Sequence, residues 1–155
     1  MPAITAVNRA KAFILTMIKL FLYFLPLVCI LAGCNNSTVS PSIPNVVVSE
    51  QIPVNSLQYP ELRQDGGYVY LNSGYKGIIV VRENANTYLA FERACPYDPT
   101  ASCALVKVDQ SRLFLIDECC KSQFNFQGNV TAGPAVYGLK RYQTALSGNL
   151  LYISN

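Results

Sequence analysis

The chain has 155 residues, a length that fits one domain. It carries twelve Lys and Arg against nine Asp and Glu, and the absence of histidine excludes the Ser/His/Asp and Cys/His arrangements of nucleophilic catalysis. Three of the twelve basic residues lie before residue 34, so a chain cut there is formally neutral, and no nucleic-acid partner is expected.

Residues 1–33 are typical of a secretory signal peptide. The run Leu20–Leu31 is twelve apolar residues long, follows three basic residues and leads into small residues. A bilayer-spanning helix needs about 20 apolar residues, so the run is too short to cross a membrane comfortably. The segment from Met17 onward forms a compact signal by itself, and Met17 is therefore interpreted as the start of translation.

The signal ends in Leu31-Ala32-Gly33-Cys34, which resembles the lipobox of bacterial, Bacteroidetes-like lipoproteins. The resemblance implies that Cys34 is lipidated and anchors the mature chain to a membrane of the cell envelope, facing the periplasm. Several acyl chains on one residue give stable attachment. The alternative is an ordinary signal anchor in which Cys34 has no role. Residues 34–53 are polar and rich in Pro and Ser, which indicates a flexible tether.

Residues 54–155 have the pattern of a small all-β domain. Short aromatic and β-branched runs alternate with Gly, Asn and Asp turns, and no window shows helical apolar spacing. The clearest expected strands are 68–71, 76–82, 87–91, 106–108, 113–116, 137–144 and 150–154. About ten short strands without a helix predict an antiparallel β sandwich or barrel, with hairpins among the later strands.

Four cysteines lie in this predicted domain: Cys95, Cys103, Cys119 and Cys120. In an exported domain four cysteines first indicate two disulfides, for which three connectivities exist. A zinc site with four sulfur ligands is one alternative, but the adjacent Cys119 and Cys120 lack the usual ligand spacing. A reactive vicinal pair at the same two residues is another alternative, and it lacks the C-x-x-C spacing of such pairs.

The motifs around these cysteines resemble Rieske iron–sulfur domains over residues 68–155. The motifs are Cys95-Pro96 after a strand, Lys121-Ser122-Gln123-Phe124-Asn125, Gly128, and Gly133-Pro134-Ala135. The resemblance implies a Rieske-like antiparallel β fold in which two cysteine-containing loops face each other. In Rieske domains two Cys and two His hold a [2Fe–2S] cluster between these loops.

The ligand pattern of the family is degenerate in this chain. Ser122 and Phe124 set a register in which the family's Cys, His, Cys and His positions are held by Cys95, Tyr97, Asp117 and Cys120, in that order. A shifted register places Cys120 at the second cysteine and Gln123 at the second histidine. Both registers lose both histidines, and oxygen donors suit a soft sulfide cluster poorly. No cofactor and no metal ion is therefore expected.

The resemblance also implies a disulfide pairing. Family members often carry one disulfide between the loops, which corresponds here to Cys103 with Cys119 and leaves Cys95 to pair with Cys120 across the vacated cluster site. Each bond is expected to contribute about 2–4 kcal/mol to stability, less than additively because the closed loops nest.

These observations predict a protein that is not an enzyme. The expectation is a lipid-anchored module with a binding or accessory role, whose partners are a membrane and an unknown protein or small molecule. The alternative is an electron-transfer protein that holds a [2Fe–2S] cluster through Cys95 and either Cys120 or Asp117.

Overall fold

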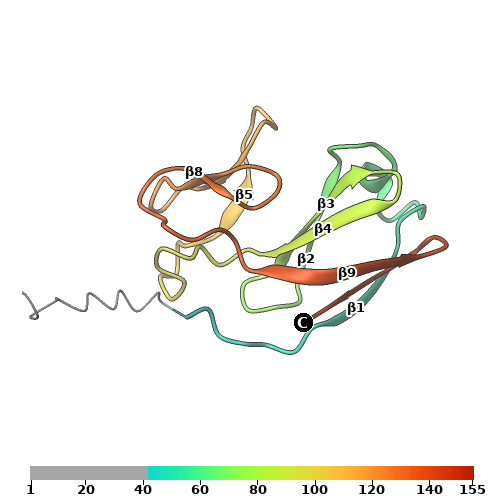
Figure 1. The fold of residues 1–155 in the computed structure, drawn as a ribbon, viewed down its shortest axis with the longest axis horizontal. Coiled ribbons are helices and arrows are strands. Elements are labelled where there is room, and N and C mark those ends of the chain that lie inside the picture. The colour runs from blue at the N-terminus through green and yellow to red at the C-terminus, as the bar shows by residue number, and fades with distance from the viewer. Residues whose placement is uncertain (1–41) are drawn as a thin grey trace, which may run out of the picture. The chain divides into compact units, whose positions relative to one another are not determined.

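The computed structural model describes residues 42–155, which form ten strands and one short 3-10 helix (Figure 1). The all-β prediction is confirmed. The predicted signal peptide 1–33, the candidate start Met17 and the predicted lipidation site Cys34 lie outside the described residues. Among residues 42–155, no helix has the length and apolar character needed to span a bilayer.

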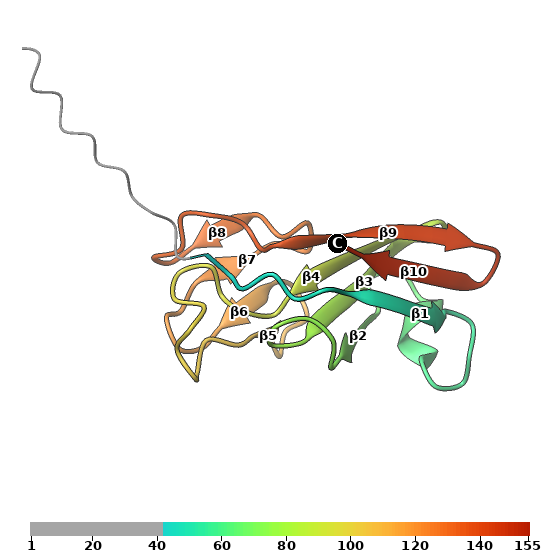
Figure 2. The same cartoon turned by 90° about the horizontal axis from the view of Figure 1, so that it is seen from below.

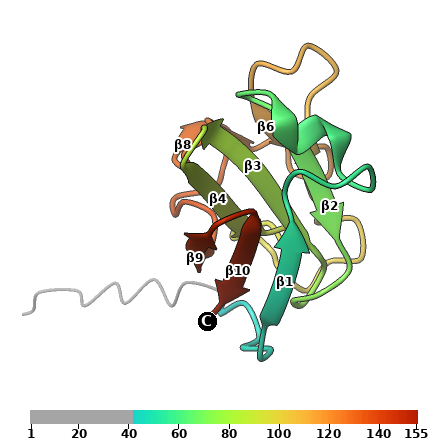
Figure 3. The same cartoon turned by 90° about the vertical axis from the view of Figure 1, so that its right-hand side faces the viewer.

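The larger of two sheets has six strands, and every adjacent pair is antiparallel. Its order is β1 (Ser49–Pro53), β10 (Leu150–Ser154), β9 (Arg141–Ser147), β4 (Thr87–Glu92), β3 (Ile78–Asn84) and β2 (Tyr68–Leu71). Figure 3 shows β1 and β10 side by side. Strand β9 joins the two halves of the sheet, because it pairs with β10 on one edge and with β4 on the other.

The smaller sheet has four short antiparallel strands, and it carries the second group of cysteines in one of its connections. Its order is β5 (Val106–Val108), β6 (Leu115–Asp117), β7 (Gln123–Phe124) and β8 (Val130–Ala132). The predicted hairpin around residues 109–112 is present as β5 and β6. Figure 2 shows this sheet at one end of the domain, while the β9–β10 hairpin reaches toward the other end.

The β3–β4 hairpin is buried on both faces and separates two hydrophobic cores. Alternate residues of a strand point to opposite faces, so Ile78 and Val80 enter the core shared with β1 and β10. Ile79 and Val81 enter the core shared with β5, β6 and β7. Burial on both faces explains why this stretch of sequence is an unbroken apolar run. The small sheet is thus packed directly on the hairpin that leads into the first cysteine loop.

Strand β1 lies inside the segment predicted as a tether. It pairs along its whole length with β10, from Ser49 opposite Ser154 to Pro53 opposite Leu150, and the preceding Val48 is buried. The predicted domain start at residue 54 is therefore corrected, and the folded domain includes β1. Strand β1 is an edge strand, and an edge strand tolerates proline, which has no amide hydrogen to donate. A polar edge strand that ends in proline can therefore have the same composition as a linker.

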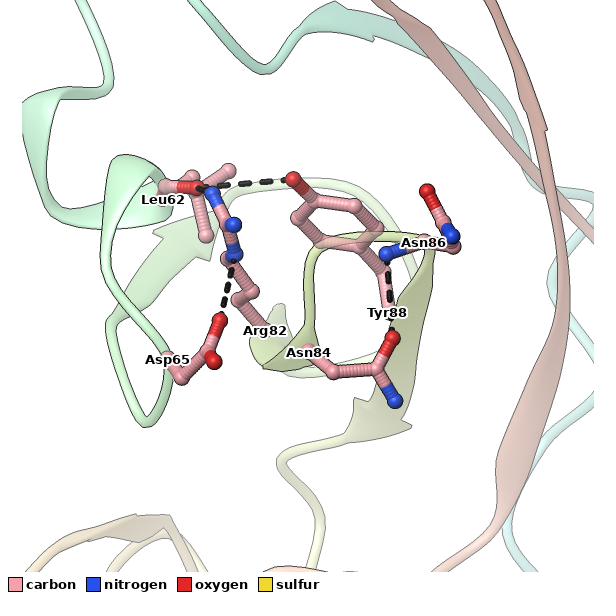
Figure 4. Close-up of polar contacts among 6 residues, drawn as sticks. All are labelled: Leu62, Asp65, Arg82, Asn84, Asn86 and Tyr88. Carbon is pink, nitrogen blue, oxygen red and sulfur yellow. Dashed lines mark hydrogen bonds and ion pairs between the residues drawn. The ribbon is translucent and has the colours of Figure 1, made fainter.

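The 3-10 helix η1 (Pro60–Arg63) is not foreseen by the apolar pattern. Its Leu62 side chain is buried in the first core, and the Leu62 carbonyl accepts hydrogen bonds from Arg82 Nη1 at 3.0 Å and from Tyr88 Oη at 3.4 Å (Figure 4). Arg82 Nε also forms an ion pair with Asp65 Oδ1 at 2.9 Å. One guanidinium group on β3 therefore fixes both η1 and the turn that follows it.

The buried carboxylate of Glu92, the last residue of β4, organises the entry to the first cysteine loop. Its Oε2 accepts hydrogen bonds from the Tyr75 amide at 2.7 Å and the Tyr142 hydroxyl at 2.7 Å. Its Oε1 accepts from the Lys76 amide at 2.8 Å and the Ala94 amide at 3.1 Å. Both oxygens face two donors each, so only a carboxylate matches this site.

The Glu92→Gln variant is expected to lower the free energy of unfolding by about 1–3 kcal/mol, because an amide NH₂ then faces donors and leaves them unsatisfied. The exposed Glu61→Gln is the matched control, with an expected change within about 0.5 kcal/mol. Urea denaturation of the two variants provides the comparison. Equal stability of the two variants would contradict this role of Glu92.

Alkaline pH is expected to destabilise the domain through Tyr142. Burial, together with the hydrogen bond and the charge of Glu92, raises the pKa of the Tyr142 hydroxyl. The unfolded tyrosine loses its proton near pH 10 while the folded one keeps it, so the free energy of unfolding falls as pH rises above about 10 and is constant in this respect below it. Tyr142→Phe is expected to reduce that slope, measured by urea denaturation between about pH 8 and 11. An unchanged slope would show that Tyr142 does not contribute.

Candidate functional site

The first cysteine loop, residues 93–105, connects β4 to β5 and is held from inside by a lysine. Lys76 Nζ donates hydrogen bonds to the carbonyl groups of Ala101 and Ala104, the latter at 3.2 Å. The Lys76 amide is also bound to Glu92. Lys76 thus links the end of β4 to the far side of this loop through hydrogen bonds that do not involve the cysteines.

The second cysteine loop, residues 118–122, connects β6 to β7 in a tight turn. The Asp117 carbonyl accepts a hydrogen bond from the Lys121 amide at 2.8 Å, and the Ser122 carbonyl accepts one from the Asp117 amide at 3.0 Å. Lys121 has a φ of 64°, in the left-handed region that favours glycine. A Cβ atom at Gly133 would lie 2.5 Å from Ser122 Cα, so the Gly133 corner packs directly on this loop.

A disulfide joins Cys103 of the first loop to Cys119 of the second, with Cα atoms 5.5 Å apart. This is the pairing that the Rieske resemblance implies. It places Cys119 at the family's disulfide position, and so it favours the register with Asp117 at the second cysteine and Cys120 at the second histidine over the shifted one with Gln123. It also removes two sulfurs from the four-cysteine zinc alternative.

The expected second disulfide is not formed. Cys95 and Cys120 are free thiols, with their Sγ atoms 3.5 Å apart. A disulfide needs a separation of about 2.05 Å, so these sulfurs are in contact without being bonded. Cys95 is buried, whereas Cys120 is partly exposed. The prediction that the two cysteines meet between the loops is right in position, and the prediction of a bond is corrected.

The Cys120 thiol has two further polar neighbours. Its Sγ lies 3.2 Å from Asp117 Oδ2 and 3.0 Å from Ser122 Oγ. Asp117 is fully buried, and its Oδ1 accepts a hydrogen bond from the Cys119 amide at 2.9 Å. The Ser122 hydroxyl in turn accepts one from the Ala135 amide at 3.0 Å.

Three of the four residues that the Rieske resemblance assigns to cluster positions lie close together. The donor atoms of Cys95, Asp117 and Cys120 all lie within 4.8 Å of one another. The Tyr97 side chain is 50% exposed. Burial raises the pKa of the Cys95 thiol; the Tyr97 amide lowers it, and hydrogen bonds with Asp117 and Cys120 raise it again.

This donor set does not fit a Rieske cluster. In that centre two sulfur ligands bind one iron and two imidazoles bind the other. In the register that the disulfide favours, Cys95 and Cys120 stand at ligand positions of different irons. Their 3.5 Å contact leaves no room between them for two bridged iron atoms. Asp117 adds a hard oxygen donor that suits a sulfide cluster poorly.

Lys76, Glu92 and Ser122 also shape the site, and the sequence signals their roles to different degrees. Glu92 is the one that the sequence marks, because a carboxylate ends an otherwise apolar strand. Ser122 fixes the register in the sequence, but its contact with Cys120 depends on the turn. Lys76 binds carbonyl groups of the first cysteine loop. This contact joins segments that are distant in the sequence, so no local sequence pattern encodes it.

A separate open hollow of about 860 Å³ lies between η1 and β2, and no cysteine lines it. Its wall includes three tyrosines, Tyr59, Tyr68 and Tyr70, and the charged Glu61, Asp65 and Arg112. The Arg82 contacts of Figure 4 hold the η1 side of this hollow in place. Aromatic rings with charged groups between them offer both packing and hydrogen bonds to a ligand.

Two packed antiparallel sheets with two crosslinked cysteine loops define a Rieske-like β fold. The chain is similar to the crystal structure of the cyanobacterial plasma membrane Rieske protein PetC3 from Synechocystis PCC 6803, with a TM-score of 0.51 and 21% identity over 72% of this chain and 100% of that chain. At this identity the likeness extends to the fold alone. No family model matches the chain, and no curated protein sequence matches it.

Replacing both Cys103 and Cys119 with Ser is expected to lower the free energy of unfolding by about 3 kcal/mol. The bond joins residues that are 16 positions apart in the sequence, and closing a loop of about 15 residues in the unfolded chain stabilises the folded state by about this amount. Dithiothreitol is expected to lower the free energy of unfolding of the parent chain to that of the double variant. The free energy of unfolding of the double variant itself is expected to stay unchanged. Urea denaturation with and without the reductant provides the measurement. A further loss in the reduced double variant would reveal a Cys95–Cys120 bond, and an unaffected parent would show that the disulfide is not structural.

Proposed function

We propose that the chain is an exported lipoprotein, anchored through Cys34 and facing the periplasm, whose Rieske-like domain works without an iron–sulfur cluster as a binding or accessory module. The observation that carries this proposal is the 3.5 Å contact between the Cys95 and Cys120 sulfurs, in a chain without histidine. It closes the space in which relatives hold the cluster, while the disulfide keeps the two loops joined.

Exposed apolar side chains favour a binding role for the loop end of the domain. Tyr97 follows Cys95 in the first loop and is 50% exposed; Val136 and Tyr137 follow the Gly133 corner and are 82% and 46% exposed. The loops that surround a cluster in Rieske domains thus present apolar surface to a partner here. The hollow beside η1 is a second surface, suited to a small ligand.

Electron transfer is the second candidate function. The observation in its favour is that Cys95, Asp117 and Cys120 present three donor atoms within 4.8 Å of one another at positions that correspond to cluster ligands. For this function the loops need to open so that the two sulfurs separate.

Chemical analysis of the full chain, purified without oxygen, separates the two functions. The proposed function predicts neither iron nor acid-labile sulfide, and two free thiols among the four cysteines of residues 42–155. Thiol titration in denaturant and metal analysis provide the measurements, with the Cys95→Ser variant as a control expected to lose one thiol. Stoichiometric iron and sulfide, lost in that variant, would establish electron transfer instead.

A further inference from the structure

Cys120 lies at the centre of a group of sulfur and oxygen atoms between the two cysteine loops. Its sulfur contacts a second thiol, Cys95 Sγ at 3.5 Å, and a buried carboxylate, Asp117 Oδ2 at 3.2 Å. Cys120 is partly exposed, while Cys95 and Asp117 are buried beneath it. The two remaining sulfurs of the described domain are bonded to each other, so Cys95 and Cys120 are each other's sulfur neighbours.

Thiol–disulfide exchange needs an accessible attacking sulfur, a second thiol within reach and a group that accepts protons. Cys120 is the more exposed of the two thiols, Cys95 lies within reach of it, and the Asp117 carboxyl group contacts it. We propose that Cys120 and Cys95 form an exchange pair that reduces a substrate disulfide, presented by an exported protein or by a small molecule, with Asp117 as the proton acceptor. This inference rests on the proposed function, because a site filled by a cluster has no free thiols.

In the first step Cys120 attacks the substrate. The Cys120 thiol gives its proton to Asp117 Oδ2, and the thiolate forms a bond to one sulfur of the substrate disulfide. The substrate S–S bond breaks, and the departing sulfur takes the proton from Asp117. The product is a mixed disulfide between Cys120 and the substrate, plus one substrate thiol.

In the second step Cys95 resolves the mixed disulfide. Cys95 passes its proton to Asp117, and its sulfur bonds to Cys120 Sγ across the present 3.5 Å contact. The second substrate sulfur leaves and takes that proton. In total the pair loses two electrons and two protons, and the substrate disulfide gains both. A dithiol, as a free molecule or on a partner protein, reverses the change and restores the pair.

The Cys103–Cys119 disulfide has a supporting role in this chemistry. It joins the two loops independently of the exchange pair, so the pair can be broken and formed while the loops stay together. It also keeps Cys119, the neighbour of Cys120 in sequence, out of the reaction.

Trapping of the mixed disulfide tests the proposal on the full chain, after iron analysis has excluded a cluster. The probe is oxidised glutathione, and a parallel arm uses the disulfides of insulin to compare a small molecule with a protein. The Cys95→Ser variant is expected to accumulate a stable adduct on Cys120, seen as added mass. The parent chain is expected to lose the thiols of Cys95 and Cys120 and to form a bond between them without an adduct.

Two matched variants assign the proton acceptor. Asp117→Asn keeps an oxygen for the Cys119 amide, and it is expected to slow the reaction of Cys120 by about 100-fold. Glu118→Gln changes the adjacent carboxylate, which is exposed and paired with Lys107 at 2.9 Å, and it is expected to react at the parent's rate. Melting temperatures establish that both variants are folded.

Several results would overturn the inference while the cluster-free function stands. The first is that the thiols of Cys95 and Cys120 react only in denaturant. The second is a co-purifying metal ion whose removal makes both thiols reactive. The third is a Cys95–Cys120 bond that glutathione buffers never reduce. Equal rates for Asp117→Asn and Glu118→Gln would remove Asp117 from the reaction. Iron and sulfide in the purified chain would overturn the proposed function as well. The iron analysis that precedes the trapping experiment detects this case separately.

Discussion

The structure depends on sulfur atoms that hold two loops together. Cys103 and Cys119 form the covalent link, and Cys95 meets Cys120 as a pair of thiols in contact. In Rieske proteins an inorganic cluster joins the corresponding loops. This chain has no histidine, and its two loops are joined by the Cys103–Cys119 disulfide. The other two sulfurs, those of Cys95 and Cys120, are thiols and form the proposed exchange pair.

The loops are also prepared by the sheets that carry them. Glu92 gathers the backbone donors at the end of β4, and Lys76 binds the carbonyl groups on the far side of the first loop. On the other side, Gly133 allows its corner to press on the second loop. Within residues 42–155 every buried side-chain nitrogen or oxygen has a hydrogen-bond partner, so these polar groups of both loops are satisfied inside the protein.

The sequence predicted seven of the ten strands, including the three-residue β5, and missed β1, β7 and β8. Strands 68–71, 87–91 and 150–154 are visible because a few β-branched and aromatic residues suffice to mark each. Strands β7 and β8 have too few residues for any periodicity, and they form because β6 offers an edge to pair with. Strand β1 has the composition of a linker and becomes a strand only beside β10.

The site was predicted in part for a similar reason. The meeting of Cys103 with Cys119, and of Cys95 with Cys120, followed from the resemblance to a family with two facing loops. Whether two facing cysteines form a bond depends on ångström-scale packing that spacing does not encode. The carboxylate beneath Cys120 was predicted as a lost ligand position, and its role as a neighbour of the thiol emerges only from the turn of the second loop.

Native mass spectrometry of the full chain, purified without oxygen, distinguishes loops joined by the Cys103–Cys119 disulfide from loops joined by a cluster. The expected mass is that of the processed and lipid-modified polypeptide less the two hydrogens of the Cys103–Cys119 disulfide, with no bound inorganic atoms. A native mass raised by two irons and two sulfides, which returns to the polypeptide mass on denaturation, would contradict it.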